Sequence, residues 1–360
     1  MKNNHYILIV AGGTGTRLYP RSREAKPKQF QKIFGNKTLL EQTYLRSKKI
    51  VGKNNIFIST NEKYVNITKK FLPEINSKQI ISEPCKKNTA PAISLAVAKI
   101  YQSDPSAIIA SIHSDHIVLK EDAFKDVINL AFDSIEIEKD IIFTIGIKPT
   151  HAHTGYGYIE KGKLKKEIDN FKIFWAEKFV EKPNHQTAEK YFKTGRFDWN
   201  AGYFIFDAKH YLDELKKYAL KLSKGINKIV KDKNNLKTIY EKFESEPVDT
   251  VIMERTDKIA VIPVDLGWSD VGSWDSVSQL FENDTDDGDG NYFEGLVSLV
   301  DTKNSMVLNE SGNKLIATIG LEDIIVVSSE DAILIVKKGK SEEVKQIVEE
   351  LKEKRKHHLV

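Results

Sequence analysis

The sequence contains a single cysteine, Cys85, among 360 residues. One thiol cannot close an intramolecular disulfide, and such sparing use of cysteine is typical of proteins from a reducing compartment. A thiol nucleophile would need a base or a positive charge arranged beside it, and no such pattern accompanies Cys85. We therefore expect neither a disulfide-bonded fold nor thiol catalysis.

Long hydrophobic runs and a strong excess of charge are also absent. No apolar run approaches the roughly 20 residues of a membrane-spanning helix, and the N-terminus leads into a core strand rather than a signal peptide. The 55 Lys and Arg residues nearly balance the 51 Asp and Glu residues, which leaves a net charge of +4. Nucleic-acid binding is therefore not indicated, and we expect a cytoplasmic protein without a membrane partner.

The pattern that is present is an alternation of strands and helices. A hydrophobic fraction of 40% is ordinary for a soluble globular protein, and the length allows about two domains. Strands are expected at 6–10, 56–58, 80–82, 107–112 and 141–147, and helices at 38–50, 90–101 and 124–132. This order predicts an α/β fold with an open, mainly parallel sheet. Ligands bind beyond the carboxyl ends of strands in such sheets, so the functional motifs should lie at one rim.

A glycine-rich stretch follows the first predicted strand. Gly12, Gly13 and Gly15 come directly after the apolar run at 6–10, and glycines let a backbone turn sharply and approach a bulky ligand. Arg17 and Lys28 add fixed positive charge just beyond. Bare amides followed by cations suit a polyphosphate, while the glycines alone would also fit a plain strand-to-helix turn.

Two familiar glycine motifs do not account for this stretch. A dinucleotide fingerprint needs a third glycine at a fixed position, and Leu18 stands there instead. A P-loop ends in Gly-Lys-Ser or Gly-Lys-Thr, which the stretch lacks. The loop therefore belongs to neither class.

The stretch at 11–30, with Thr16-Arg17-Leu18 and Pro27-Lys28-Gln29-Phe30, resembles the signature of sugar-1-phosphate nucleotidyltransferases. Its ending is most similar to the mannose-1-phosphate guanylyltransferase (GDP-mannose pyrophosphorylase) branch. The resemblance implies a Rossmann-like mixed sheet flanked by helices, and the transfer of GMP from GTP to α-D-mannose 1-phosphate with release of pyrophosphate. It further implies nucleotide contacts from Ala11, Gly12, Gly13, Gly15, Thr16, Arg17 and Lys28.

A second motif, at 83–93, joins a predicted strand to a predicted helix. It reads as a helix N-terminus with Asn88 or Thr89 as cap and Pro91 in the first turn. It also suits a base pocket, because the Glu83 carboxylate could accept hydrogen bonds from N1–H and the 2-amino group of guanine. The stretch resembles the base segment of the guanylyltransferases, although Lys-Lys replaces the frequent Gly-Arg at 86–87. The implied contacts are Glu83, Asn88, Thr89, Ala90 and Pro91.

Two aspartates are candidates for a metal site. His113-Ser114-Asp115-His116 follows the strand at 107–112, and its histidines, with His151 and His153, leave a zinc site as an alternative. Mg²⁺ prefers oxygen ligands and substrate phosphates, which favours Asp115. The motif resembles the family's Pro-x-Asp-His with histidine in place of proline.

The second of these aspartates, Asp270, lies in a Gly-Trp turn at 267–274. The turn could be only a packed corner, but it resembles the family's late metal motif. We therefore expect Mg²⁺ as cofactor, bound by Asp115 and Asp270.

The sugar side is assigned from three short motifs. Glu181-Lys182-Pro183 would by default be a solvated ion pair, yet it resembles a family motif in which Lys182 grips the sugar phosphate and Glu181 binds sugar hydroxyls. Asn200, in Trp-Asn-Ala-Gly, would offer an amide, and Gly157 would let the backbone reach the sugar. We expect 155–222, with helical segments at 187–193 and 207–222, to form the sugar side of the cleft. The cations of catalysis are expected to be Arg17, Lys28 and Lys182.

The remainder of the chain predicts a smaller C-terminal domain. Residues 283–290 read as a polar linker rather than an EF-hand, because two ligand positions lack aspartate. Short β segments at 296–336 predict a β-rich domain like a left-handed β-helix. Residues 341–356 predict an amphipathic helix with Val344, Ile347, Val348 and Leu351 on one side. We expect domains at 1–284 and 285–360, with a homodimer as the candidate assembly. Alternatives are a thymidylyl- or uridylyltransferase acting on glucose 1-phosphate, or a non-catalytic sugar-nucleotide sensor.

Overall fold

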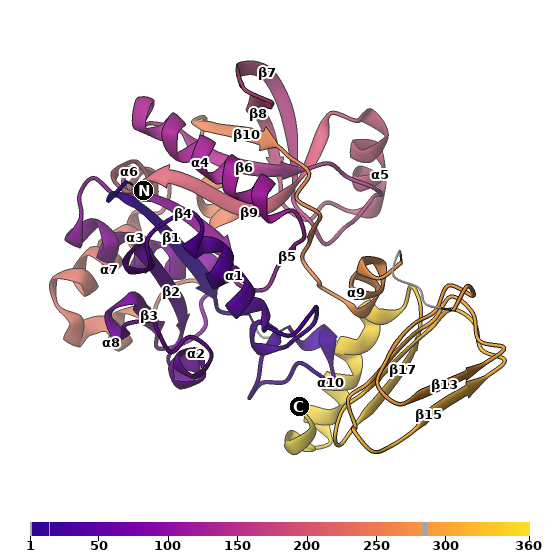
Figure 1. The fold of residues 1–360 in the computed structure, drawn as a ribbon. Coiled ribbons are helices and arrows are strands. Elements are labelled where there is room, and N and C mark those ends of the chain that lie inside the picture. Colours follow the sequence, from indigo (N-terminus) through magenta and orange to yellow (C-terminus); the bar gives the residue numbers. More distant parts are fainter. Residues whose placement is uncertain (1, 14, 283–286) are drawn as a thin grey trace. The chain divides into compact units, whose positions relative to one another are not determined.

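The fold comes from a computed structural model that describes residues 2–13, 15–282 and 287–360 (Figure 1). The chain divides into two compact units. The first unit comprises Met1–Gly12, Glu41–Ser114 and Val118–Trp268, and the second comprises Gly13–Leu40, Asp115–Ile117 and Ser269–Val360. The predicted domain boundary at 284/285 and the first half of the linker at 283–290 lie outside the described residues, so that boundary stays a prediction.

The first unit is built on a nine-stranded sheet with the order β3-β2-β1-β4-β9-β6-β10-β8-β7. Strands β1, β2, β3, β4, β6 and β10 run in one direction, whereas β9 lies antiparallel between β4 and β6. This confirms the predicted mixed, mainly parallel sheet. The strands are β1 His5–Ala11, β2 Ile56–Asn61, β3 Ile80–Glu83, β4 Ile108–His113, β6 Ile142–Ile147, β7 Tyr158–Ile168, β8 Phe171–Val180, β9 Phe197–Asp207 and β10 Ile259–Pro263.

Helices cover both faces of this sheet, which explains why its central strands are apolar throughout. Leu8 and Val10 of β1 pack in one cluster with Ile93 of α3, whereas the ring of His5 stacks on Phe132 of α4 at 4.4 Å between centroids. Successive residues of a strand point to opposite faces, so α3 and α4 lie on opposite sides. The helices are α1 Leu39–Lys48, α2 Val65–Phe71, α3 Thr89–Ser103, α4 Glu121–Ile137, α5 His185–Thr194, α6 Ala208–Tyr218, α7 Leu220–Lys231 and α8 Leu236–Tyr240.

The helix predicted at 207–222 proves to be two helices. Ala219 leaves helical geometry (φ −137°, ψ 58°), so α6 ends at Tyr218 and α7 begins at Leu220. Leu215 and Ile226 then both reach the same core cluster. The apolar spacing of a helix continues across this break, which is why the pattern alone predicted one helix. No helix in the described ranges has the length and hydropathy needed to cross a membrane.

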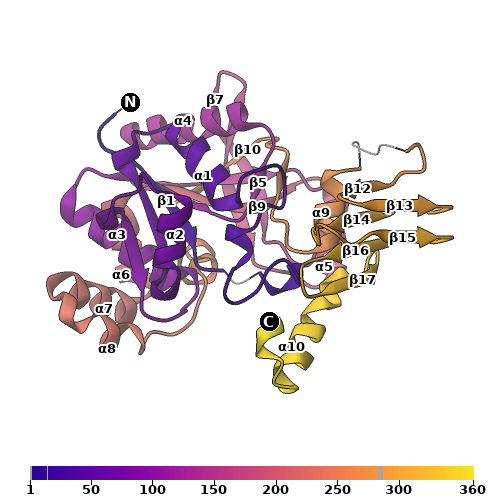
Figure 2. The same cartoon turned by 60° about the horizontal axis from the view of Figure 1, so that its bottom comes forward.

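The second unit contains short strands that pair mainly in parallel (Figure 2). β12, β14 and β16 pair in parallel, as do β13 and β15, and β17 closes the larger sheet antiparallel to β16. This confirms the β-rich C-terminal part, while its handedness stays a prediction. The strands are β12 Tyr292–Glu294, β13 Val297–Val300, β14 Met306–Asn309, β15 Ile316–Ile319, β16 Ile324–Ser328 and β17 Ile333–Lys337; β5 Ile117–Val118 and β11 Trp268–Ser269 form a separate pair.

The core of the second unit joins segments that are far apart in the chain. Trp274, the first residue of α9 Trp274–Leu280, is fully buried, and its Nε1–H donates to the carbonyl oxygen of Tyr19 at 2.8 Å. Val344 and Val348 of α10 Val344–Glu353 bury their side chains in the same cluster. Ile347, predicted to share their buried side, is 40% exposed. The glycine-rich stretch is therefore packed with the C-terminal strands and helix.

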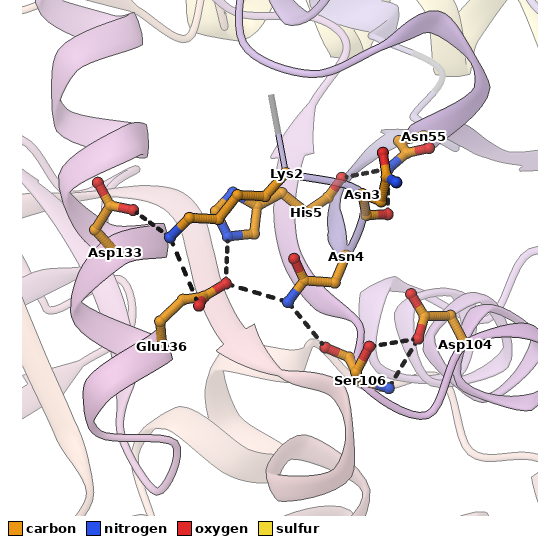
Figure 3. A network of polar contacts seen from close by, with 9 residues as sticks. All are labelled: Lys2, Asn3, Asn4, His5, Asn55, Asp104, Ser106, Asp133 and Glu136. Carbon is orange, nitrogen blue, oxygen red and sulfur yellow. Dashed lines mark hydrogen bonds and ion pairs between the residues drawn. The ribbon is translucent and has the colours of Figure 1, made fainter.

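A polar network fixes the beginning of β1 in the first unit (Figure 3). Glu136 of α4 accepts a hydrogen bond from Asn4 Nδ2 at 3.1 Å and is bonded to His5 Nε2 at 3.0 Å. Lys2 Nζ lies 3.6 Å from Glu136 and 3.0 Å from Asp133. These contacts tie the first strand to α4 at the amino ends of the parallel strands.

Candidate active site

The carboxyl ends of β1, β3 and β4 bring predicted residues together in the first unit. In the strand register Val10 lies opposite His113, and Glu83 lies at the end of β3. Gly12 follows β1 directly, and a Cβ atom built on it would lie 3.8 Å from Glu83 Oε1. The Gly12 main chain therefore lies beside the Glu83 carboxyl group, as the rim prediction requires.

Glu83 is held by a residue that the sequence did not indicate. Its side chain is 5% exposed, and Tyr240 Oη donates to Glu83 Oε2 at 2.5 Å while Ser59 Oγ lies 3.5 Å from Oε1. Burial raises the pKa of Glu83 to about 7, and the bonds from Tyr240 and Ser59 act in the opposite direction. Tyr240 lies 157 positions from Glu83 in the chain, so no local sequence pattern could predict this contact.

The base segment forms the N-terminus of α3, which confirms the helix-cap prediction. The Asn88 side chain accepts from the Thr89 N–H at 2.9 Å, and its φ of 65° lies in the left-handed region. Thr89 Oγ1 accepts from the Val248 N–H at 2.9 Å, and the Ala90 N–H donates to the Glu246 carbonyl at 3.1 Å. Ala90 and Pro91 are buried, and the Ala90 N–H is already used by Glu246.

Three predicted sugar-side residues meet in the first unit. A Cβ atom on Gly157 would lie 2.6 Å from Glu181 Oε2 and 3.6 Å from Asn200 Nδ2. A side chain at position 157 would therefore displace the Glu181 carboxylate from its place beside Asn200. The Asn200 N–H donates to the Gly157 carbonyl at 2.8 Å.

Lys182 is the exposed member of this group. Its side chain is 60% exposed and its Nζ pairs with Glu181 Oε1, while its φ of 45° is unusual for a residue with a side chain. The Glu181 N–H donates to Glu254 Oε1 at 2.9 Å. The turn that carries Glu181 and Lys182 is thus anchored while the ammonium group stays accessible.

Asp249 joins the sugar-side group without having been predicted. Asn200 Nδ2 donates to Asp249 Oδ1 at 2.9 Å. Burial, and then the negative charge of Glu181, raise the pKa of Asp249 to about 7. Its place at the start of a five-residue π-helical turn, Asp249–Met253, is a feature that often accompanies functional sites but cannot be read from sequence.

The four histidines considered for a zinc site lie in two different environments. His153 stacks on Tyr156 at 4.0 Å, and His151 lies edge-on to Trp199 at 5.2 Å between ring centroids. Among the described residues, the group whose ligand atoms lie within 4.8 Å of one another consists of His113, Asp115 and His116. His151 and His153 are therefore part of an aromatic cluster and do not join that group.

In the second unit, Lys28 links the two predicted metal loops. Its side chain is 5% exposed, and its Nζ donates to Asp115 Oδ2 at 3.0 Å and to the main-chain oxygen of Asp270. Gly15 has φ 59°, and a Cβ atom there would lie 2.3 Å from Lys28 Cβ. The glycine is thus required for the lysine stem to pass through the loop.

The loop that carries Asp270 is tightly constrained. The Gly272 N–H donates to Asp270 Oδ1 at 2.9 Å, and Val271 has φ 42°, a strained value for a β-branched residue. Strain of this kind collects at functional sites. A Cβ atom on Gly13 would lie 3.9 Å from Asp115 Oδ2, so the glycine-rich stretch runs beside the other aspartate.

The remaining predicted nucleotide residues are spread along the same stretch. Ala11 ends β1, and Thr16 opens a 3₁₀ turn, Thr16–Leu18. Arg17 is 44% exposed on its side chain, and its Nε lies 3.1 Å from Glu342 Oε2. Arg17 is therefore paired with the C-terminal segment of its own unit.

The chemistry of these donors fits a divalent cation. Asp115 and Asp270 offer carboxylate oxygens, and the Lys28 ammonium bound between their loops shows that the local field stabilises positive charge. Oxygen donors suit Mg²⁺, whereas histidine nitrogens would suit zinc. The described residues can thus hold a divalent metal.

Comparisons with known proteins agree with this arrangement. Residues 6–287 match the family described as Nucleotidyl transferase, and residues 295–351 match a MannoseP isomerase/GMP-like beta-helix domain. Mannose-1-phosphate guanylyltransferase 2 of Escherichia coli O157:H7 is 39% identical, across 96% of this chain and 73% of the relative. Mannose-1-phosphate guanylyltransferase of Escherichia coli strain K12 is 38% identical, across 98% and 74%.

A solved structure gives the same result for the fold. It is described as mannose-1-phosphate geranyltransferase from Thermus thermophilus, and it matches with a TM-score of 0.87 at 26% identity, across 97% of this chain and 99% of that one. The family match at 6–287 includes the glycine-rich stretch and both aspartates. The chain therefore belongs to the nucleotidyl transferase family.

Proposed function

We propose that this protein transfers GMP from GTP to α-D-mannose 1-phosphate, which forms GDP-mannose and pyrophosphate. The observation that carries the proposal is the sequence likeness, at 39% and 38% identity, to two proteins named mannose-1-phosphate guanylyltransferase. The glycine-rich stretch, the buried lysine and the two aspartates supply the parts that such a transfer needs.

In this proposal the catalytic work is alignment and charge neutralisation. The sugar phosphate is already a nucleophile at neutral pH, so no general base is needed for in-line attack on the α-phosphorus. Arg17 and Lys28 stabilise the α-phosphate and the departing pyrophosphate, and Lys182 holds the attacking phosphate. The amides of Gly12, Gly13 and Gly15 cradle the triphosphate; the other main-chain contacts are Ala11 and Thr16.

Asp115 and Asp270 would hold Mg²⁺ in this scheme. When bound, the ion would neutralise phosphate charge and help to orient the reacting groups. Asp270→Ala should then lower turnover by on the order of 10²–10³ while the protein stays folded. Near-normal turnover of a folded Asp270→Ala variant would remove Asp270 from the metal site.

The base and sugar contacts complete the assignment. Glu83 accepts from the Watson–Crick edge of guanine, with Asn88, Thr89, Ala90 and Pro91 forming the rest of the base segment. Gly157, Glu181 and Asn200 bind the sugar.

We further propose domains at 1–284 and 285–360, a homodimer and a cytoplasmic location. Gel filtration with light scattering would test the homodimer, and cell fractionation would test the location.

A substrate matrix tests the proposed reaction. GTP, dTTP and UTP are each mixed with mannose 1-phosphate or glucose 1-phosphate and Mg²⁺, and pyrophosphate release is measured. GTP with mannose 1-phosphate should be the best pair. A best pair with dTTP or UTP would replace the substrate assignment, and nucleotide binding without pyrophosphate release would identify a sensor.

A further inference from the structure

One short segment of the first unit contacts both proposed substrate regions. The Glu246 carbonyl accepts from Ala90, and the Val248 N–H donates to Thr89 Oγ1, so the segment holds the N-terminus of α3. Shortly after Glu246, Asp249 accepts from Asn200. Val248 and Asp249 are adjacent in the chain, so neighbouring residues make the two contacts.

The hydrogen bonds of Asn200 leave one N–H of its side-chain amide for a ligand. Its Oδ1 accepts from the Gly202 N–H at 2.9 Å and from Thr144 Oγ1 at 3.2 Å, which uses both acceptor positions of that oxygen. Its Nδ2 donates one hydrogen to Asp249. A backbone donor on one side and a carboxyl acceptor on the other therefore fix which end of the amide is oxygen and which is nitrogen, and one Nδ2 hydrogen remains for a ligand.

The surroundings of Asp249 suit the task of orienting the Asn200 amide. The Glu254 N–H bonds to the Asp249 main-chain carbonyl at 2.9 Å, and Glu254 Oε1 is already bonded to the Glu181 N–H. The Asp249 carboxyl group is the one that accepts from the Asn200 amide. The Glu181 carboxylate lies near the same amide, on the other side of Gly157. A planar amide between two carboxyl groups offers a directed donor for a sugar hydroxyl.

We propose that Asp249 is a positioning residue that aims the Asn200 amide at the sugar and so sets sugar recognition. This inference rests on the proposed function, because it takes Asn200 to be a sugar contact. Asp249 itself need not touch the substrate. Loss of its acceptor oxygen would leave the Asn200 amide held from its oxygen end alone, and the buried Nδ2 group would lose a partner.

Three variants test the inference with the full-length protein and GTP, mannose 1-phosphate and Mg²⁺. Asp249→Ala removes the acceptor and should raise the KM for mannose 1-phosphate roughly tenfold, the equivalent of about 1.4 kcal/mol, with the KM for GTP unchanged. Asp249→Asn keeps an acceptor oxygen and should rescue that KM to within about twofold. Thr250→Val removes a bond in the same turn, from Thr250 Oγ1 to the Pro247 carbonyl, and should leave both KM values unchanged.

A double-mutant cycle separates positioning from general damage. In an Asn200→Ala background, Asp249→Ala should have no further effect on the KM for mannose 1-phosphate, because the amide that it aims is gone. If Asp249→Ala does not fold, Asp249→Ser, whose hydroxyl is too short to reach Asn200, takes its place in the cycle. Discrimination between mannose 1-phosphate and glucose 1-phosphate should fall in the folded variant.

The outcomes distinguish this inference from the proposed function. Equal increases in both KM values, additive effects in the cycle, or an Asp249→Asn variant as impaired as Asp249→Ala would overturn the positioning role. A wild-type protein that turns over another pair of substrates would instead overturn the mannose assignment. In that case the same cycle, run with the sugar phosphate that is turned over, still decides whether Asp249 acts through Asn200.

Discussion

Lys28 carries a buried charge that is balanced by oxygen atoms from two separate loops. Burying an ammonium group without partners costs several kcal/mol, and here Asp115 Oδ2 and the Asp270 carbonyl provide them. A metal ion bound by Asp115 would use the same carboxylate. Lys28 and the proposed metal would therefore compete for Asp115 until substrate phosphates offered the lysine another anion.

The competition predicts opposite effects on two measurements for Lys28→Met. Turnover should fall by on the order of 10²–10³, because a charge-assisted contact to phosphate is lost. Binding of Mn²⁺, followed by electron paramagnetic resonance without nucleotide, should become tighter, because the competing cation is removed. Mn²⁺ serves here as a probe for the Mg²⁺ site.

Lys26→Met is the matched control, since Lys26 is exposed in the same stretch. It removes one positive charge without touching Asp115, so both measurements should stay near wild type. Weaker Mn²⁺ binding in Lys28→Met than in Lys26→Met would contradict the competition.

The proposed function of Glu83 and its effect on the stability of the fold are opposed. Its pKa is raised to about 7 by burial, so folding disfavours the ionised form and the penalty grows as pH rises from about 4.5 to above 7. Glu83→Gln should therefore raise the free energy of unfolding at pH 8 by about 1–3 kcal/mol, a gain that disappears near pH 4.5. The same change should raise the KM for GTP, because guanine loses its carboxylate acceptor.

Urea unfolding at the two pH values measures the stability part of this prediction. Glu244→Gln, at an exposed position, should show neither the gain at pH 8 nor the change in KM. A Glu83→Gln variant that is less stable than wild type at pH 8 would mean that the Tyr240 contact depends on the charge of the carboxylate.

At the scale of elements, the attachment of β1 to α4 is expected to depend on pH. The ring of His5 is buried against Phe132 and bonded to Glu136, and burial outweighs the Glu136 charge and lowers the pKa of His5. Folding therefore favours the neutral ring. The stability that it contributes is fully present above the usual histidine pKa of about 6.5 and is lost as pH falls below that value.

His5→Gln should remove this part of the pH dependence. The variant can still donate to Glu136 but cannot become charged, so its unfolding free energy should fall less than that of wild type between pH 7.5 and 5.5. His185→Gln, at a side chain that is 74% exposed, should follow wild type. Parallel curves for His5→Gln and wild type would assign the dependence to other buried histidines, such as His210.

Most elements could be predicted because each carries its own local pattern. The apolar run of β1 and the Asn88 cap of α3 depend on neighbouring residues, and both are found in the structure. The break at Ala219 was missed because it serves the packing of α6 and α7 rather than any local preference. Predictions thus failed where tertiary packing decided the geometry.

At the scale of the whole molecule, the second unit joins the glycine-rich stretch to the C-terminus. Leu18 and Tyr19 share a core with Val344 and Val348 of α10, and Ser341 bonds to Asp275 at the start of α9. The residues proposed to hold phosphate therefore depend on the far end of the chain for their packing.

A chain that ends at residue 340 should lose stability in the second unit. Burial of the two valines contributes about 1.5–3 kcal/mol each, so the loss should be about 3–6 kcal/mol, and tryptic cleavage within 13–40 should become faster. Ile347→Ser, at a side chain that is 40% exposed, should change neither in the full-length protein. Unchanged protection of 13–40 in the shortened chain would show that α10 is dispensable for this packing.

The sequence by itself determined the fold class, the family and the residue types of the proposed site, because strand periodicity, the glycine-rich stretch and the short motif around each aspartate are local patterns. Only the tertiary structure decided that Tyr240 holds Glu83, that Asp249 holds Asn200 and that Lys28 bonds to Asp115. Each of these contacts joins residues separated by 49 to 157 positions. Their geometry is set by how strands and helices pack, and no spacing along the chain encodes it.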